Sequence, residues 1–155
     1  MTYHILLYAH IIGACVLLGT GAGIAFFFVV SNYWGTPEMI GHVGRIVVLA
    51  DTIFTATAAV FQPITGYFLA HEAGWSLGEP WIMLSLGLYV IVGIFWLPVV
   101  WIQIRLRNMA LEAARLGTGL NESYRKLYRI WVIFGFPAFI AVILIVWLMI
   151  SKPYI

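Results

Sequence analysis

The sequence predicts an all-α protein, a bundle of four helices that each cross a membrane. Hydrophobic residues make up 63% of its 155 residues and charged residues only 9%, whereas a soluble domain carries roughly 25% charged residues. The apolar residues gather in four runs, at 5–30, 46–70, 81–102 and 130–150. A helix needs roughly 20 apolar residues to cross a hydrocarbon core about 30 Å thick, and the runs are too long for barrel strands. We expect one integral membrane domain over residues 1–155.

The run at 5–30 predicts a retained first helix, because it lacks a preceding basic segment and exceeds a signal peptide's apolar region of about 7–15 residues. Gly19 and Gly23 form a small-xxx-small pair, which permits close helix approach. This face could pack within the chain or against a second copy in a homo-oligomer. Cys15 is the only cysteine, and we expect it to be a small core thiol.

The second helix, which contains the run at 46–70, carries a polar stripe that lipid would not tolerate cheaply, so this stripe should face the bundle interior. Its members are Gly44, Asp51, Thr55, Ala58, Gln62 and Thr65. A carboxylate inside a membrane needs a partner or a cavity. Asp51 could form a helix-tying ion pair with Arg45, Arg105 or Arg129. Alternatively, it could relay protons or anchor a bound cofactor by hydrogen bonds.

The third and fourth runs have recognisable starts. Pro80 suits the first turn of the third helix, and Asn121 could cap the fourth, with Glu122 in its first turn. A second polar and aromatic cluster falls on the third helix, at Trp81, Ser85, Tyr89, Trp96 and Gln103. Other aromatic residues fit belts at the membrane surfaces, namely Tyr3, Trp34, Trp75, Trp147 and Tyr154.

The basic residues predict the orientation. All but one lie near the first or third connection, at Arg45, Arg105, Arg107, Arg115, Arg125, Lys126 and Arg129; Lys152 falls on the other side. The positive-inside rule then places these connections in the cytoplasm and both termini outside, in the periplasm for a bacterial inner membrane protein. We expect residues 105–129 to extend the third and fourth helices as polar turns. Basic residues beside apolar spans give no indication of nucleic-acid binding.

Two histidines are candidate metal ligands. His10 lies about two turns inside the external surface and His71 at the external end of the second helix. Imidazole binds haem iron and other transition metals, so the two could share a ligand if Pro63 and Gly66 bend that helix. His10 could bind with another partner, or simply be satisfied by a hydroxyl or a carbonyl group. The motifs of soluble hydrolases, kinases and dinucleotide-binding enzymes do not occur.

Five segments carry a family resemblance: YAHIIGACVLLGTGAG (Tyr8–Gly23), RIVVLADTIFTATAAVFQPITGY (Arg45–Tyr67), GEPWIMLSLGLY (Gly78–Tyr89), WLPVVWIQIRLR (Trp96–Arg107) and RIWVIFGFPAF (Arg129–Phe139). Together they resemble the predicted integral membrane proteins grouped as domain of unknown function 2269. The resemblance covers nearly the whole chain and brings no established activity.

The first helix contains a His-Ile-Ile segment at His10–Ile12. A similar segment opens the HemJ-type protoporphyrinogen oxidases, which the sequence resembles more distantly, as it does the CopD-type copper-resistance membrane proteins. The HemJ-type proteins have an arginine early in the second helix, similar to Arg45, and a proline and glycine near its end, similar to Pro63 and Gly66. These proteins bind haem b, so the resemblance implies haem ligation by His10.

The third helix departs from that pattern. HemJ-type proteins have a tryptophan there, followed four residues later by a functional lysine; this sequence has Trp81 and then Ser85. Oxidase activity therefore does not follow from the resemblance.

Three hypotheses for function follow. In the first, the bundle is a haem b-binding redox or haem-metabolism accessory protein, with His10 as an axial ligand. The haem pocket would be lined by Gln62, Trp81, Ser85 and Tyr89. Arg45 would contact an anionic edge of the haem or serve only as an anchor to lipid headgroups. In the second, it is a non-enzymatic structural or assembly subunit whose polar stripes hold helices together. In the third, it handles a small ion or metal, although few Met and His residues gather on the external side.

Overall fold

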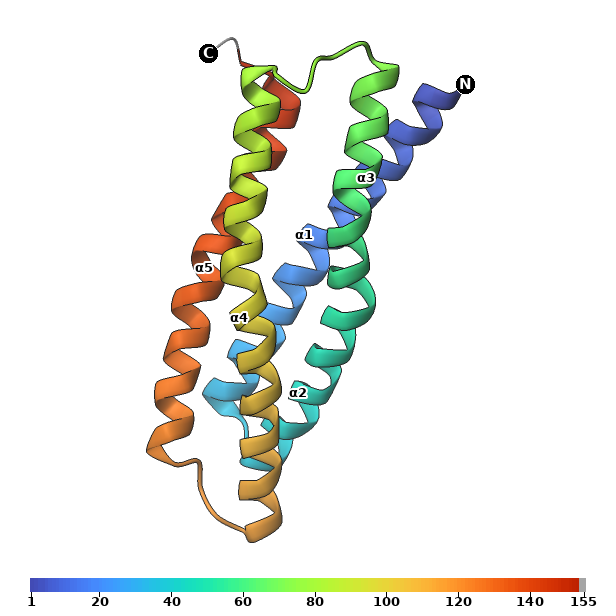
Figure 1. Cartoon of the computed structure of the whole chain (residues 1–155). Coiled ribbons are helices and arrows are strands. Elements are labelled where there is room, and N and C mark those ends of the chain that lie inside the picture. Colours follow the sequence, from blue (N-terminus) through green and yellow to red (C-terminus); the bar gives the residue numbers. More distant parts are fainter. Residues whose placement is uncertain (154–155) are drawn as a thin grey trace.

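The computed structural model describes residues 1–153 and contains four long helices (Figure 1). The first is α1 (Thr2–Trp34). The second consists of three consecutive segments, α2 (Pro37–Ala50), η1 (Asp51–Thr55) and α3 (Ala56–Glu72). The third is α4 (Pro80–Leu116) and the fourth is α5 (Glu122–Ser151). All four are long and apolar enough to cross a membrane, which confirms the predicted fold class.

The helix ends follow the predicted local signals. Pro80 occupies the first turn of α4, where its missing N–H costs no hydrogen bond. Gly117 ends α4 in the left-handed region, with φ of 64°, which a residue without Cβ adopts readily. The Asn121 side chain caps α5 by accepting a hydrogen bond from the Tyr124 N–H at 2.9 Å. Both helices continue beyond their apolar spans toward this connection, as predicted.

A single turn of π-helix interrupts the second long helix. In η1 the Ala56 N–H donates to the Asp51 carbonyl, five residues earlier rather than four. Such a turn inserts one extra residue into the helix and frequently occurs at functional sites. Asp51 and Thr55, at its two ends, are both buried.

The helices pack in pairs. α3 packs against α1 and α5 against α4, while α2 packs against α4 and α1 (Figure 1). Phe28, Ile40, Leu106, Tyr124 and Trp131 are central members of the largest buried apolar cluster. This cluster therefore joins all four helices near the connections between α1 and α2 and between α4 and α5.

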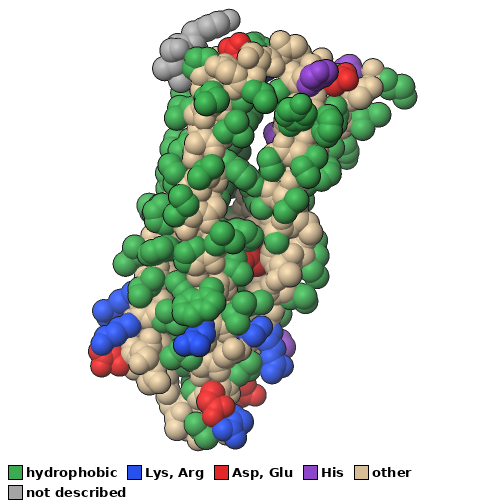
Figure 2. All heavy atoms as spheres, viewed as in Figure 1, with side chains coloured by type: hydrophobic (Ala, Val, Ile, Leu, Met, Phe, Trp, Pro, Cys, Tyr) green, Lys and Arg blue, Asp and Glu red, His purple; other side chains and the backbone are tan. Residues whose placement is uncertain are grey.

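The two ends of the bundle differ in charge. α1 begins and α5 ends at the same end, which we call the terminal end (Figure 1). Basic side chains gather at the opposite end (Figure 2). We call this the basic end, defined by Arg45, Arg105, Arg107, Arg115, Arg125, Lys126 and Arg129. The positive-inside rule uses such a difference in basic residues between the two ends to predict which end lies in the cytoplasm.

The outer faces of the helices are apolar. Large side chains such as Phe26, Val60, Ile133 and Phe136 are exposed in the isolated chain, as expected for helices that face lipid. Cys15 is also exposed, so the prediction of a core thiol is wrong. It lies on a face of α1 that turns away from the other helices.

The aromatic side chains expected at the membrane surfaces lie at both ends of the bundle. Trp34 is exposed where α1 ends. Trp75 lies at the terminal end, with the Lys152 Nζ 5.2 Å from its ring centre. Tyr154 lies outside the described residues.

Candidate functional site

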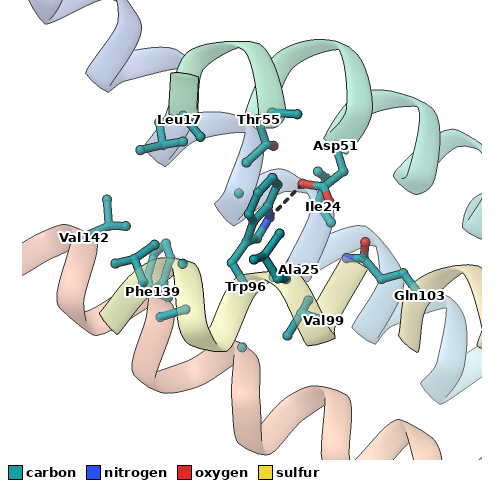
Figure 3. Close-up of a pocket in the computed structure, with 18 of the residues that line it drawn as sticks. Leu17, Ile24, Ala25, Asp51, Thr55, Trp96, Val99, Gln103, Phe139 and Val142 are labelled. Carbon is teal, nitrogen blue, oxygen red and sulfur yellow. Dashed lines mark hydrogen bonds between the residues drawn. The ribbon is translucent and has the colours of Figure 1, made fainter. Parts of the chain in front are cut away.

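A cavity of about 580 Å³ lies midway along the bundle and is not fully enclosed. Segments from every helix line it, mostly through aliphatic and aromatic side chains (Figure 3). In the space-filling view, an acidic side chain is visible in a hollow between apolar side chains at this height (Figure 2). The labelled lining residues are Leu17, Ile24, Ala25, Asp51, Thr55, Trp96, Val99, Gln103, Phe139 and Val142.

Asp51 is the only acidic residue that lines this cavity, and no Lys, Arg or His lines it. Its side chain is 3% exposed, and its Oδ1 accepts a hydrogen bond from the Trp96 indole N–H at 3.3 Å. Its Oδ2 has no hydrogen-bond partner among residues 1–153. One carboxylate oxygen is thus held by α4. The other makes no hydrogen bond of ordinary geometry within residues 1–153, although the Thr55 hydroxyl interacts with the same carboxylate at longer range.

The expected ion pair between Asp51 and an arginine does not form. The ion pairs within the described part of the chain join Arg115 to Glu112 and Lys126 to Glu122, both on the surface. Arg45 is exposed at the basic end. It precedes Asp51 by six residues, about 9 Å along a helix, and six residues of regular helix also turn it well away from the face of Asp51. The partner of Asp51 is an indole N–H, and the ion-pair prediction is wrong.

Thr55 behaves differently from the other threonines of its helix. Thr52, Thr57 and Thr65 each donate their hydroxyl to the carbonyl four residues earlier. Thr55 Oγ1 is buried and has no hydrogen-bond partner in the described structure. The carbonyl that it would normally reach belongs to Asp51, and this carbonyl accepts the N–H that closes the π-turn. The Thr55 hydroxyl thus makes no bond of ordinary geometry to its own helix, and the side chain near it is the Asp51 carboxylate.

Two further polar atoms are unsatisfied at the same cavity. Gln103 of α4 is 2% exposed and Trp131 of α5 is 5% exposed. Neither Gln103 Oε1 nor Trp131 Nε1 has a hydrogen-bond partner within residues 1–153. With Asp51 Oδ2 and Thr55 Oγ1, they make up all the buried side-chain atoms found unpaired in this part of the chain. All four residues line the one cavity.

His10 and Gln62 connect α1 to α3 away from this cavity. The Gln62 amide donates to the His10 carbonyl at 2.8 Å, and His10 Nδ1 lies 2.9 Å from Thr65 Oγ1. The tautomer of His10 decides which of the two groups donates in this hydrogen bond. The Thr65 hydroxyl thus pairs with one ring nitrogen of His10. This agrees with the prediction that a hydroxyl or a carbonyl group satisfies His10.

The close approach of these helices depends on small residues. A Cβ at Gly13 would collide with the Gln62 amide. The His10 ring lies against Gly66, with Cε1 3.2 Å from the place a Cβ would take. His71 is exposed and lies about 9 Å farther along α3 than Thr65. The structure thus does not bring His10 and His71 together at one ligand.

The other predicted site residues are also separated. Ser85 donates to the Trp81 carbonyl of its own helix at 2.7 Å. Tyr89 lines the central cavity and donates its hydroxyl to the Ala59 carbonyl, which links α4 to α3. Arg45 is exposed at the basic end. Of the six residues predicted to hold a cofactor, Tyr89 alone lines this cavity.

Trp131 is not among the site residues that the sequence predicts, because residues 130–150 are almost wholly apolar and have no polar stripe. An indole inside such a span, which must bury its N–H, is a signal that could have indicated the site.

The small face of α1 at Gly19 and Gly23 is open, since a Cβ added at either glycine would meet no atom within 4 Å in the described chain. Packing within the chain therefore does not use this face, and contact with a second copy stays a prediction.

The family model described as predicted integral membrane protein (DUF2269) matches residues 4–153. None of the curated proteins and no solved structure matches this sequence. The match spans nearly the whole chain, which therefore belongs to this family of integral membrane proteins.

Proposed function

We propose that this member of the family is an intramembrane binding protein for a lipophilic small molecule with a polar head group. One observation carries the proposal: the four buried, unpaired polar atoms of Asp51, Thr55, Gln103 and Trp131 all belong to residues that line one cavity. Leaving a buried polar group unpaired costs about 1–3 kcal/mol. A head group that pairs with these atoms would recover that energy, while its tail would occupy the apolar remainder of the cavity.

The proposed ligand enters sideways from the bilayer. The cavity is not fully enclosed, and its walls are aliphatic and aromatic. Apolar pockets with a few convergent polar groups are the usual form of small-molecule sites.

Filling the cavity tests the proposal. Gly93 of α4 and Gly135 of α5 both line the cavity, and a Cβ at either meets no described atom within 4 Å. Gly93→Leu and Gly135→Leu should therefore be accommodated and occupy the ligand's space. Gly87→Leu is the matched control, because Gly87 lies on α4, has equally open surroundings and does not line the cavity.

The assay is equilibrium binding of isotope-labelled dodecanol to protein in lipid nanodiscs. We expect saturable binding by wild type and Gly87→Leu, and loss of this binding in both cavity-filling variants. Equal uptake by all four proteins would refute the proposal, because it would mean partition into lipid alone.

Haem b binding through His10 is a separate prediction. His10 lines neither the central cavity nor the smaller one at the terminal end, so the prediction of haem binding rests on the family resemblance alone. Among the residues searched, no three or more His, Cys, Asp or Glu side chains gather as a metal site. An oxidised-minus-reduced optical spectrum tests haem directly. A Soret band that His10→Ala abolishes would establish it.

A structural role is the second candidate. It is favoured by the hydrogen bonds that tie α1 to α3 through His10, Gln62 and Thr65. A purely structural bundle would be stabilised by Gly93→Leu without any change in dodecanol binding, which distinguishes the two functions.

We also propose that the protein lies in a bacterial inner membrane with its basic end in the cytoplasm. The charge difference between the two ends supports this orientation. A tag at Met1 should be accessible to a membrane-impermeant reagent in intact spheroplasts, and protection of this tag until lysis would overturn the orientation.

A further inference from the structure

We infer that the central cavity selects a lipophilic amine, a molecule with a protonated amino head group and an apolar tail. This inference rests on the proposed binding function and names the chemistry of its ligand.

The first argument is charge. Asp51 is the only acidic residue that lines the cavity, no Lys, Arg or His lines it, and the Asp51 side chain is almost completely buried. No Lys or Arg side chain of residues 1–153 forms an ion pair with it. An uncompensated carboxylate is costly at membrane depth, and intramembrane carboxylates ordinarily pair with another group. A cationic ligand supplies the missing countercharge, whereas an anionic amphiphile would be repelled.

The second argument is the kind of hydrogen bond on offer. Three of the four unpaired atoms accept hydrogen bonds: Asp51 Oδ2, Thr55 Oγ1 and Gln103 Oε1. A primary ammonium group has three N–H donors and no acceptor. The number of acceptors in this one cavity thus equals the number of donors of such a head group, and a bond from the ammonium to Asp51 would be charge-assisted. The remaining atom, Trp131 Nε1, is a donor, so it would contact an acceptor farther along the ligand.

The third argument is the aromatic neighbour. The Trp96 indole holds Asp51 Oδ1 through its N–H, and its ring lies in the cavity beside the carboxylate (Figure 3). An indole face attracts cations, more strongly when water is excluded. Carboxylate and indole together thus favour a positive head group over a neutral one of the same size.

Three probes with one alkyl chain separate charge from hydrophobicity: dodecylamine, dodecanol and dodecanoate. Each is titrated against labelled dodecanol on protein in zwitterionic nanodiscs, and the signal of Gly93→Leu is subtracted as lipid partition. We expect wild type to prefer dodecylamine to dodecanol by about tenfold or more, with dodecanoate weakest.

Substitutions then assign this preference. Asp51→Asn should weaken the binding of dodecylamine by about tenfold or more and have a much smaller effect on the binding of dodecanol. Glu72→Gln removes the same charge from an exposed position and should leave all three affinities unchanged. Asp51→Glu should retain the amine preference, and this variant decides the matter if Asp51→Asn does not fold.

The outcomes are distinguishable. If wild type binds dodecanol in a Gly93-dependent way but shows no preference for the amine, or if Asp51→Asn keeps that preference, amine selection is wrong and the binding function stands. If no probe distinguishes wild type from Gly93→Leu, the binding function itself fails.

Discussion

Replacing Thr55 by valine should stabilise the ligand-free protein, although it removes a polar group from a helix interface. Valine has nearly the shape of threonine, so the change removes only the hydroxyl. Thr55 is 6% exposed, and its Oγ1 has no hydrogen-bond partner of ordinary geometry in the described chain. Thr65 is the matched control, because it lies on the same long helix, is 4% exposed and holds His10 Nδ1 at 2.9 Å.

The magnitudes follow from these two environments. A buried hydroxyl without a partner costs about 1–3 kcal/mol in protein mutants, so Thr55→Val should raise the free energy of unfolding by about 1 kcal/mol. Hydrogen bonds between membrane helices contribute about 0.6 kcal/mol on average and about 1.7 kcal/mol at most. Thr65→Val should therefore lower the free energy of unfolding by about that amount. The two variants should differ by about 2 kcal/mol, with opposite signs.

The assay is unfolding of delipidated protein by sodium dodecyl sulfate in mixed micelles, followed by far-ultraviolet circular dichroism. If Thr55→Val lowers the stability as much as Thr65→Val does, the hydroxyl of Thr55 is already paired in the ligand-free protein. The reasoning about a vacant polar site would then be wrong.

Two further predictions concern the packing that holds the cavity in place. The Tyr124 hydroxyl donates to Asn32 Oδ1 at 2.6 Å and so links α5 to α1. Tyr124→Phe should lower the free energy of unfolding by about 1–2 kcal/mol in the same assay. An unchanged free energy of unfolding would contradict this prediction. A Cβ at Gly41 would lie 2.6 Å from Leu111 Cδ2, so Gly41→Val should separate α2 from α4 and destabilise the bundle by more than about 1 kcal/mol. Gly87→Val, in open surroundings, is its control, and equal effects of the two would refute this account.

Much of the fold could be predicted because it depends on signals that are local in sequence. The four helices follow from apolar runs longer than a membrane is thick. The cap at Asn121 and the start at Pro80 follow from side-chain chemistry within one turn. The polar stripe of the second helix also lies inward as predicted, with Asp51, Thr55 and Thr65 all buried.

The site could be predicted only in part, because it depends on which helix meets which. Asp51 was identified from its burial cost, but its partner Trp96 lies 45 residues away, and nothing local in the sequence selects an indole over an arginine. The π-turn has no sequence signal that would distinguish it from regular helix. Gln62 faces the bundle interior, as the polar stripe predicts, but its amide binds the His10 carbonyl at the α1–α3 contact and neither residue lines the cavity.

The π-turn has a consequence for how the cavity could change its width. It separates a segment, α2, that packs on α4 from a segment, α3, that packs on α1. The two halves of one membrane span therefore differ in their main partner, and η1 is the joint between them. A small change of angle at this joint would move α3 relative to α4, and the hydrogen bond from Tyr89 of α4 to the Ala59 carbonyl of α3 would have to yield. Asp51 and Thr55 are part of the joint itself, so a ligand that binds them would also fix the angle of the span.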